Sequence, residues 1–132
     1  IKSFKSEYDA YTVVKLAVNN YAGYNYLVMD QWTPWQNWLL EIEKEMGVKG
    51  QFKYIVYPNP ENDEYRLQAV PPTATSFDQR KPLPESWKGK RGEELENASG
   101  IEGAVFCHPG GFISGWSTLE AAKKAAEKAL LT

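Results

Sequence analysis

The sequence predicts an α/β domain, a mixed β-sheet with helices packed on it, and three observations support this prediction. Apolar residues recur at helical spacing near both ends of the chain and once between them. Short runs rich in aromatic and β-branched residues lie between these stretches, as expected for strands. The chain has 132 residues, 42% of them hydrophobic and 24% charged, which suits a single domain over residues 1–132.

The first part of the chain predicts a helix, a strand and a second helix. Apolar residues recur every three or four positions over residues 4–19, which predicts an amphipathic helix. The apolar run at residues 26–29 predicts a buried strand. For the second helix, Thr33 is the expected N-cap, Gln36 completes its capping box, and Gly47 is the expected left-handed stop.

The middle of the chain predicts an antiparallel hairpin followed by a long irregular stretch. Residues 52–57 and 65–70 are rich in aromatic and β-branched residues, and the Pro- and Asn-rich segment 58–63 separates them. Residues 71–92 show no periodic pattern. A stretch of this length in a compact domain is typical of a functional or a disordered loop.

The last part of the chain predicts a short helix, two strands and a closing helix. Residues 93–97 favour the short helix, and the strands are expected at residues 104–107 and 112–114. Ser117 and Glu120 form a second capping box, which predicts that the closing helix begins there.

The charge and the cysteine content restrict the partners and the compartment. The formal net charge is −2, so any contact with a nucleic acid must come from a local cluster of basic residues. The single cysteine rules out an internal disulfide framework and favours a reducing, intracellular compartment. No apolar run approaches the roughly 20 residues that span a bilayer, so no membrane partner is expected. The first residue is Ile1 rather than Met, which leads us to expect a fragment of a longer protein.

Basic side chains gather in the long loop. They are Arg80, Lys81, Lys88, Lys90 and Arg91. Trp87 lies among them, and basic residues interleaved with an aromatic one suit a phosphate backbone with a stacked base. The alternative is a solvated loop in which Trp87 packs into the core beside Leu83. For Trp87 itself we favour this packing role, because prolines flank Leu83 on both sides.

A glycine-rich turn between the last two strands is the second candidate for phosphate binding. The candidate residues of this turn are His108, Gly110, Gly111 and Ser114. An imidazole can donate a hydrogen bond to a phosphate, and glycines let a ligand approach the backbone amides. The closing helix begins just beyond and adds the positive end of its dipole. The alternative is a hairpin turn with an incidental histidine.

The sequence offers little for independent catalysis. One histidine and one cysteine cannot form a zinc cluster. A magnesium or manganese site made only of carboxylates stays open, but Asp30, Asp63 and Asp78 show no suggestive spacing. Ser114 and His108 lack a third group that would orient the imidazole for nucleophilic catalysis. We therefore expect no catalytic residue and no metal ligand in this chain.

Five strings of the sequence resemble the C-terminal half of the Myg (melanocyte-proliferating-gene) exonuclease family. They lie at residues 68–71, 76–89, 99–103, 105–108 and 111–115. The string R-K-P-L-P-E-x-W begins at Arg80, and the string H-x-x-G-F-I-x-G begins at His108. Both are long and chemically unusual, which argues against a chance similarity.

The resemblance implies a function and a division of labour. The family is similar to the DHH phosphoesterases, two-lobed hydrolases of phosphodiesters, and a eukaryotic member is described as an RNA exonuclease working from the 3′ end. The chain would then be the substrate-gripping, C-terminal lobe of a metal-dependent phosphodiesterase or exonuclease acting on RNA or nucleotides. It would bind no cofactor itself, because the divalent metal, manganese or magnesium, belongs to an N-terminal catalytic lobe outside it. Arg80, His108, Gly110 and Gly111 would correspond to the family's phosphate-gripping residues.

Two alternatives stay open beside this interpretation. In the first, the chain is a stand-alone module that binds a nucleotide or single-stranded nucleic acid without cutting it. In the second, it is a structural piece that forms a homo-oligomer through tyrosines, namely Tyr8, Tyr11, Tyr21, Tyr24 and Tyr26. The expected compartment is the cytoplasm, or the mitochondrion or nucleus in a eukaryote. The main interpretation depends on one expectation, that the basic loop near residue 80 and the turn near residue 108 converge on an anion.

Overall fold

The structure, a computed structural model, describes residues 2–59, 61–73, 76 and 78–132, with side chains described from residue 10 onward, so the side chain of Tyr8 lies outside the described part. The elements are α1 (Lys2–Asn20), β1 (Tyr26–Val28), α2 (Gln36–Met46), β2 (Tyr54–Pro58), β3 (Tyr65–Ala69), the 3-10 turn η1 (Glu85–Trp87), α3 (Gly92–Ser99), β4 (Ala104–Cys107), β5 (Ile113–Trp116) and α4 (Leu119–Leu130). The predicted class, helices packed on a mixed sheet, is confirmed.

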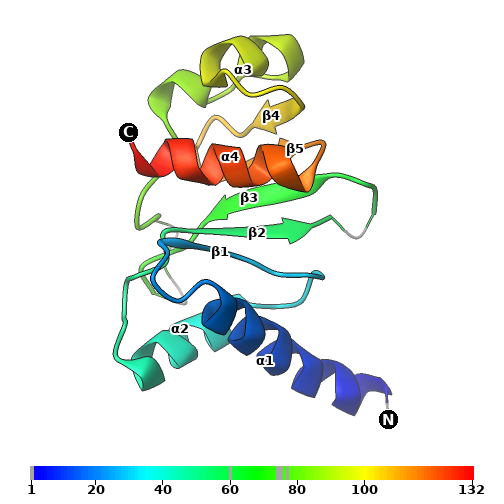
Figure 1. Cartoon of the computed structure of the whole chain (residues 1–132), viewed down its shortest axis with the longest axis vertical. Coiled ribbons are helices and arrows are strands. Elements are labelled where there is room, and N and C mark those ends of the chain that lie inside the picture. The colour runs from blue at the N-terminus through cyan, green and yellow to red at the C-terminus, as the bar shows by residue number, and fades with distance from the viewer. Residues whose placement is uncertain (1, 60, 74–75, 77) are drawn as a thin grey trace.

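Five strands form one sheet in the order β1-β2-β3-β5-β4 (Figure 1). Strands β1 and β2 are parallel, and the remaining neighbours are antiparallel. Strands β2 and β3 are the predicted hairpin. Because β5 runs antiparallel to both β3 and β4, the ends of β3 and β4 lie at the same edge of the sheet as the start of β5, on the left in Figure 1.

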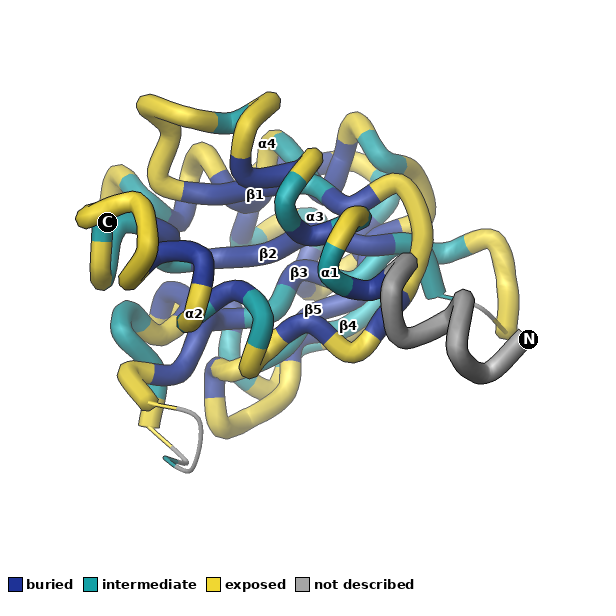
Figure 2. The backbone as a smooth tube through the Cα atoms, turned by 90° about the horizontal axis from the view of Figure 1, so that it is seen from below, coloured by how far each residue is buried: buried dark blue, intermediate teal, exposed yellow. Residues whose placement is uncertain are grey.

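Helices cover both faces of the sheet, and alternation along β2 shows the two cores. Tyr54 and Val56 pack toward α4, whereas Ile55 and Tyr57 pack toward α1 and α2. All four side chains are buried, so the central strand is apolar on both faces. Figure 2 shows the strands as mostly buried segments between loops that are largely exposed. Burial of each such side chain contributes about 1.5–3 kcal/mol to folding.

The helix pair α1 and α2 covers only half of its face of the sheet. On β3, β5 and β4 the side chains of this face are partly exposed, and we call them the open face: Arg66, Gln68, Phe106 and Ile113. The guanidinium of Arg66 lies over the ring of Phe106, 5.0 Å from its centroid. Both side chains lie over Gly115, where a Cβ would come within 2.6 Å of each. Gly115 therefore allows the cation–π pair to lie flat on the sheet.

Both predicted capping boxes are wrong by one or more residues. Helix α2 begins at Gln36, and Trp35 occupies the N-cap position without a side-chain hydrogen bond, whereas Thr33 is buried before it. Helix α4 is capped by Thr118, whose hydroxyl accepts a hydrogen bond from Ala121 N at 3.1 Å. Ser117 lies one residue before the cap, and its amide donates to Gly103 O at 2.8 Å.

The predicted end of α2 is confirmed, since Gly47 adopts the left-handed conformation with φ of 72°. Within the described part of the chain, none of the helices is both long enough and apolar enough to cross a bilayer.

Candidate functional site

The long loop runs directly along the glycine-rich turn. Leu83 N donates to Gly111 O at 2.9 Å, and Gly89 N donates to Cys107 O at 3.0 Å. Cys107 N in turn donates to Lys90 O at 2.9 Å. The loop and the turn therefore lie side by side, whereas the prediction that their side chains converge on an anion stays a prediction.

These contacts place three basic residues of the loop and one histidine along β4, at one edge of the sheet. We call this set the basic edge: Lys88, Lys90, Arg91 and His108. Arg91 pairs with Phe106 in an antiparallel bridge, and its side chain is exposed, as is that of His108. The positive charge of the loop is thus brought beside the imidazole by backbone hydrogen bonds rather than by side-chain contacts.

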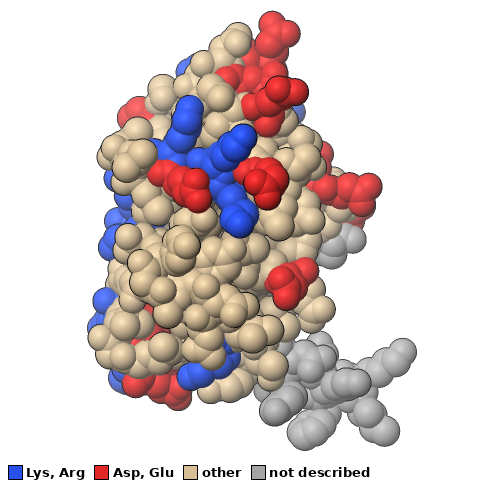
Figure 3. All heavy atoms as spheres, viewed as in Figure 1, with Lys and Arg blue, Asp and Glu red and all other residues tan. Residues whose placement is uncertain are grey.

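The exposed face of α4 and the edge at which β3 and α4 end differ in how their charges are distributed. Figure 3 shows basic and acidic side chains intermingled on the exposed face of α4, where Lys123, Lys124 and Lys128 alternate with Glu120 and Glu127. Basic side chains also follow the left edge in this view, the edge at which β3 and α4 end. Lys81 lies near this end of α4, since its Nζ donates to Thr132 O at 3.0 Å. The mixed surface of α4 carries little net field, so the edge is the better candidate for an anion.

The loop is fixed from beneath by apolar side chains. Trp87 is 3% exposed and packs edge-on against Trp116, with ring centroids 5.7 Å apart. Leu83 is buried beside it in the same core, and Tyr54 Oη donates to Pro82 O at 3.0 Å. The packing role favoured for Trp87 is confirmed, and its ring is not available to stack on a base.

Lys88 lies across the turn. The φ of Gly111 is +73°, and a Cβ at this position would come within 2.5 Å of Lys88 Cε. A glycine is therefore required both by the backbone conformation and by the lysine side chain above it. Lys88 Nζ makes an ion pair with Glu85 Oε1 at 2.7 Å, in which the Lys88 side chain is 24% exposed and the Glu85 side chain is 83% exposed. Such a surface pair is weak, so it leaves Lys88 able to exchange its partner for a phosphate.

The hydrogen bond made by His108 fixes the orientation of its ring. Nδ1 accepts a hydrogen bond from Gly110 N at 2.9 Å, so the proton of the neutral imidazole resides on Nε2. The ring rests against Phe112 at a centroid distance of 4.5 Å. The Nε2–H of this exposed side chain is the donor available to a ligand.

Three predicted ligands have partners inside the protein. Gly110 N donates to His108 Nδ1, and Gly111 N donates to His108 O at 2.9 Å. Ser114 is fully buried, and its hydroxyl accepts from Trp116 Nε1 at 2.8 Å. The structure thus uses these groups to build the turn and the sheet, and the geometry gives no support for phosphate binding by them.

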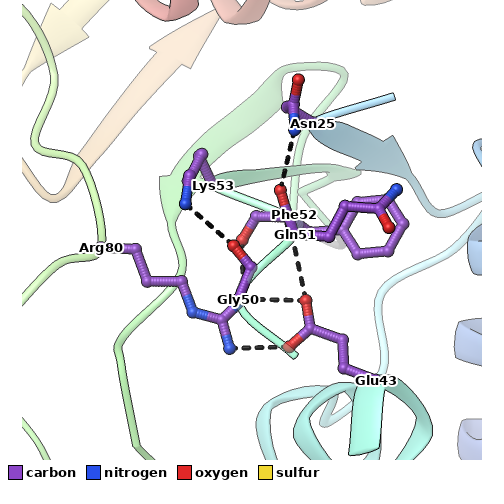
Figure 4. Close-up of polar contacts among 7 residues, drawn as sticks. All are labelled: Asn25, Glu43, Gly50, Gln51, Phe52, Lys53 and Arg80. Atoms are coloured by element: carbon purple, nitrogen blue, oxygen red, sulfur yellow. Dashed lines mark hydrogen bonds and ion pairs between the residues drawn. The ribbon is translucent and has the colours of Figure 1, made fainter. Parts of the chain in front are cut away.

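Arg80 is the clearest difference from the expected site. Its guanidinium makes a two-pronged ion pair with Glu43, with Nη1–Oε2 at 2.8 Å and Nη2–Oε1 at 2.7 Å. Nη1 also donates to Phe52 O, and Phe52 N donates to Glu43 Oε2 (Figure 4). The two side chains are 6% and 0% exposed. Arg80 therefore joins the loop, α2 and the segment before β2, and its guanidinium does not face solvent at the basic edge.

The sequence did contain a signal for this ion pair. Glu43 follows Leu39 by four positions and therefore lies on the apolar face of α2, where Leu39 and Ile42 are also buried. A carboxylate in such a position needs a cation and further hydrogen bonds. Arg80 supplies both oxygens of Glu43 with a donor.

Cys107 is buried beside the basic edge, and its thiol is expected to be unreactive. Burial raises the pKa of its thiol to about 11, and the charges of Lys88 and Lys90 act in the opposite sense. The thiol therefore stays protonated near neutral pH and is a poor nucleophile. Within residues 10–59, 61–73, 76 and 78–132, no three His, Cys, Asp or Glu side chains gather closely enough to hold a metal ion. The described residues thus do not fit a metal centre.

Comparisons with known proteins identify relatives of the chain. The MYG1 exonuclease family model, described as "Uncharacterised protein family (UPF0160)", matches residues 1–130. The MYG1 protein of Schizosaccharomyces pombe is 47% identical over 104 residues, which cover 79% of the chain and 32% of that protein. The MYG1 protein of Dictyostelium discoideum is 42% identical over 104 residues, covering 79% of the chain and 31% of that protein.

A mammalian relative carries a functional name. The MYG1 exonuclease of Mus musculus is 38% identical over 97 residues, which cover 74% of the chain and 25% of that protein. The chain thus spans a third or less of the length of these curated relatives. No solved structure matches the chain significantly.

Proposed function

The chain belongs to the MYG1 exonuclease family, and from that premise we propose that it grips the phosphate backbone of single-stranded RNA for a larger phosphodiesterase. The relatives named as exonucleases support a nuclease-type function. The gripping role and the preference for RNA are our proposals.

One observation supports the gripping role above the others. The hydrogen bonds between residues 83–90 and the turn bring Lys88, Lys90 and His108 to the same edge of the sheet. The loop carries the charge and the turn carries the directional donor, so a single ligand can use both. A phosphodiester, which has a negative charge and several acceptor oxygens, is the ligand that this pairing suits.

The residues have separate roles in this proposal. Lys88, whose side chain is 24% exposed, and Arg91, which is exposed, neutralise backbone phosphates. His108 donates from Nε2–H to a phosphate oxygen, because Nδ1 is occupied by the Gly110 amide. Arg80 positions the loop from within and does not contact the ligand.

The chemistry of cleavage is assigned to another part of a larger protein. We propose a two-lobed arrangement of the DHH phosphoesterase kind, in which this chain is the C-terminal lobe. A divalent metal, manganese or magnesium, would be held outside the chain. The contribution of the residues described here is then to hold the strand in a fixed position, which is a substantial part of catalysis by itself.

The proposal is tested by binding of a short, fluorescein-labelled single-stranded RNA to the chain, followed by fluorescence anisotropy. We expect Lys88→Gln and His108→Ala each to lower the affinity by roughly three- to tenfold, because each removes one charged or directional contact. Lys88→Gln should also reduce the slope of log affinity against log salt by about 0.7.

The matched control is Lys124→Gln, which removes an equally simple positive charge from the exposed face of α4. This variant should bind RNA within about twofold of the unmodified chain, as expected for a charge outside the contact. An equal loss of affinity in Lys124→Gln and Lys88→Gln would show nonspecific attraction and contradict the proposal. The absence of any RNA binding would contradict it too.

A further inference from the structure

A groove runs between the beginning of α2 and the open face of β3. Two adjoining cavities of about 510 and 340 Å³ share the side chains of Gln36 and Gln68 and together form this groove. Its walls include Trp32, Gln36, Asn37, Tyr57, Gln68 and Phe112. The groove exists because α1 and α2 leave this half of the sheet uncovered.

The chemistry of these walls is aromatic and amide-rich. Trp32 is 46% exposed and Phe112 is 37% exposed, so both rings offer apolar surface to a ligand. Among the described lining residues there is no lysine or arginine, and Asp78 is the one charged side chain. The groove therefore suits a flat, uncharged group with hydrogen-bonding edges, and it disfavours a phosphate.

The hydrogen bond made by Gln68 orients its amide toward such a group. Tyr57 Oη donates to Gln68 Oε1 at 2.6 Å, so the carbonyl end of this amide is engaged. Gln68 lines both cavities, so its amino end is the part of the amide that can donate to an acceptor atom on the edge of a base. Tyr57 itself is held in the core, so the amide is fixed rather than mobile.

Phe112 connects the groove with the basic edge. Its ring lines one of the two cavities and also contacts the ring of His108. A ligand whose phosphate lies at His108 would thus have its neutral part beside Phe112. Nucleotides in an unpaired strand combine these two parts, whereas paired bases are hidden inside a duplex.

From this arrangement we infer that the groove holds unpaired nucleobases, with Phe112 and Trp32 as stacking surfaces and Gln68 as a donor to a base edge. The inference rests on the proposed function, since it names the bases of the same strand whose phosphates lie on the basic edge. Aromatic grooves also bind proline-rich peptides, but such a peptide would make no use of the charge beside Phe112.

The test compares two ligands of equal charge. The affinity of the chain is measured for a short single-stranded RNA and for a stable abasic analogue with the same number of phosphates. We expect the RNA to bind about tenfold more tightly, because stacking on aromatic side chains contributes to the affinity for each base held. Trp32→Ala should reduce this preference severalfold and leave the affinity for the abasic analogue unchanged. Phe112→Ala should also reduce the preference, but it removes the ring against which His108 rests and should therefore weaken binding of both ligands.

Two further variants separate stacking from folding. Phe112→Tyr keeps an aromatic ring and should keep the preference for RNA. Tyr24→Ala removes an aromatic ring that is 52% exposed but lines a different cavity, and it should have no effect on the preference.

The outcomes distinguish this inference from the proposed function. If the RNA and the abasic analogue bind equally and Lys88→Gln weakens both, the groove holds no base and the phosphate grip stands. If neither ligand binds, the proposed function is wrong and the inference is wrong with it. Binding of a proline-rich peptide in the groove, together with equal affinities for the RNA and the abasic analogue, would also overturn the inference.

Discussion

The two ends of the basic loop use positive charge in opposite ways. At its beginning, Arg80 is almost fully buried and holds Glu43 through two short hydrogen bonds. Near its end, Lys88 pairs with Glu85, whose side chain is 83% exposed. A two-pronged, desolvated pair fixes the fold, while a single contact in water can be replaced by a ligand.

The comparison shows that a cluster of basic residues in a sequence is not one functional unit. Arg80 and Lys88 both lie in the string of residues 76–89 that resembles the family. Arg80 makes a buried ion pair that stabilises the fold, whereas Lys88 makes an ion pair with an exposed glutamate. Arg80 has a further function, because Arg80 N also donates to Val70 O and so fixes where the loop leaves the hairpin. The loop can then reach the turn and present Lys88 there.

Breaking the internal pair should have the largest effect. Arg80→Ala leaves the Glu43 carboxylate buried without its cation, and we expect a loss of about 3–5 kcal/mol in the free energy of unfolding. The measurement is urea denaturation followed by tryptophan fluorescence and circular dichroism. Lys88→Ala is the matched variant and should cost less than about 1 kcal/mol.

A paired substitution sharpens this result. Arg80→Met combined with Glu43→Leu removes both charges and should recover much of the lost stability, because the penalty comes from the orphaned carboxylate. Equal stability losses for Arg80→Ala and Lys88→Ala would mean that the two ends of the loop do not differ as described.

A smaller effect is expected from the glycine beneath Lys88. Gly111→Ala places a Cβ in a left-handed conformation and should cost about 1–2 kcal/mol. Gly47→Ala is its control, since φ is 72° there and nothing lies within 4 Å of a Cβ. Both variants should lose similar backbone energy in denaturation experiments. Gly111→Ala also displaces the Lys88 side chain and should therefore weaken RNA binding, whereas Gly47→Ala should not. Equal RNA affinities of the two variants would argue against a role for Lys88 in binding.

Much of the fold could be predicted because its signals are local. The periodicity of residues 4–19, the hairpin around residues 58–63 and the stop at Gly47 all depend on neighbours in sequence, and the structure agrees with them. The capping boxes failed at Thr33 and Ser117. Thr33 is buried ahead of its helix, and Ser117 N pairs with the distant Gly103 O, so each helix begins later in the chain than predicted.

The candidate site was less predictable because its geometry is not local. The approach of the loop to the turn was expected, but the internal partner of Arg80 lies 37 positions away on α2. The groove was not predicted at all. Its Gln36 and Gln68 come from different elements and carry no pattern in the sequence, and an uncovered sheet face appears only once the helices are placed.

The most direct test of the account is to map the contact surface of single-stranded RNA on the isotope-labelled chain by ¹H–¹⁵N NMR. We predict that the amides of residues 87–91 and 107–112 shift on titration, while those of Glu43, Phe52 and Arg80 stay in place. Shifts centred on Arg80 or on the exposed face of α4, with residues 88 and 108 unaffected, would contradict it.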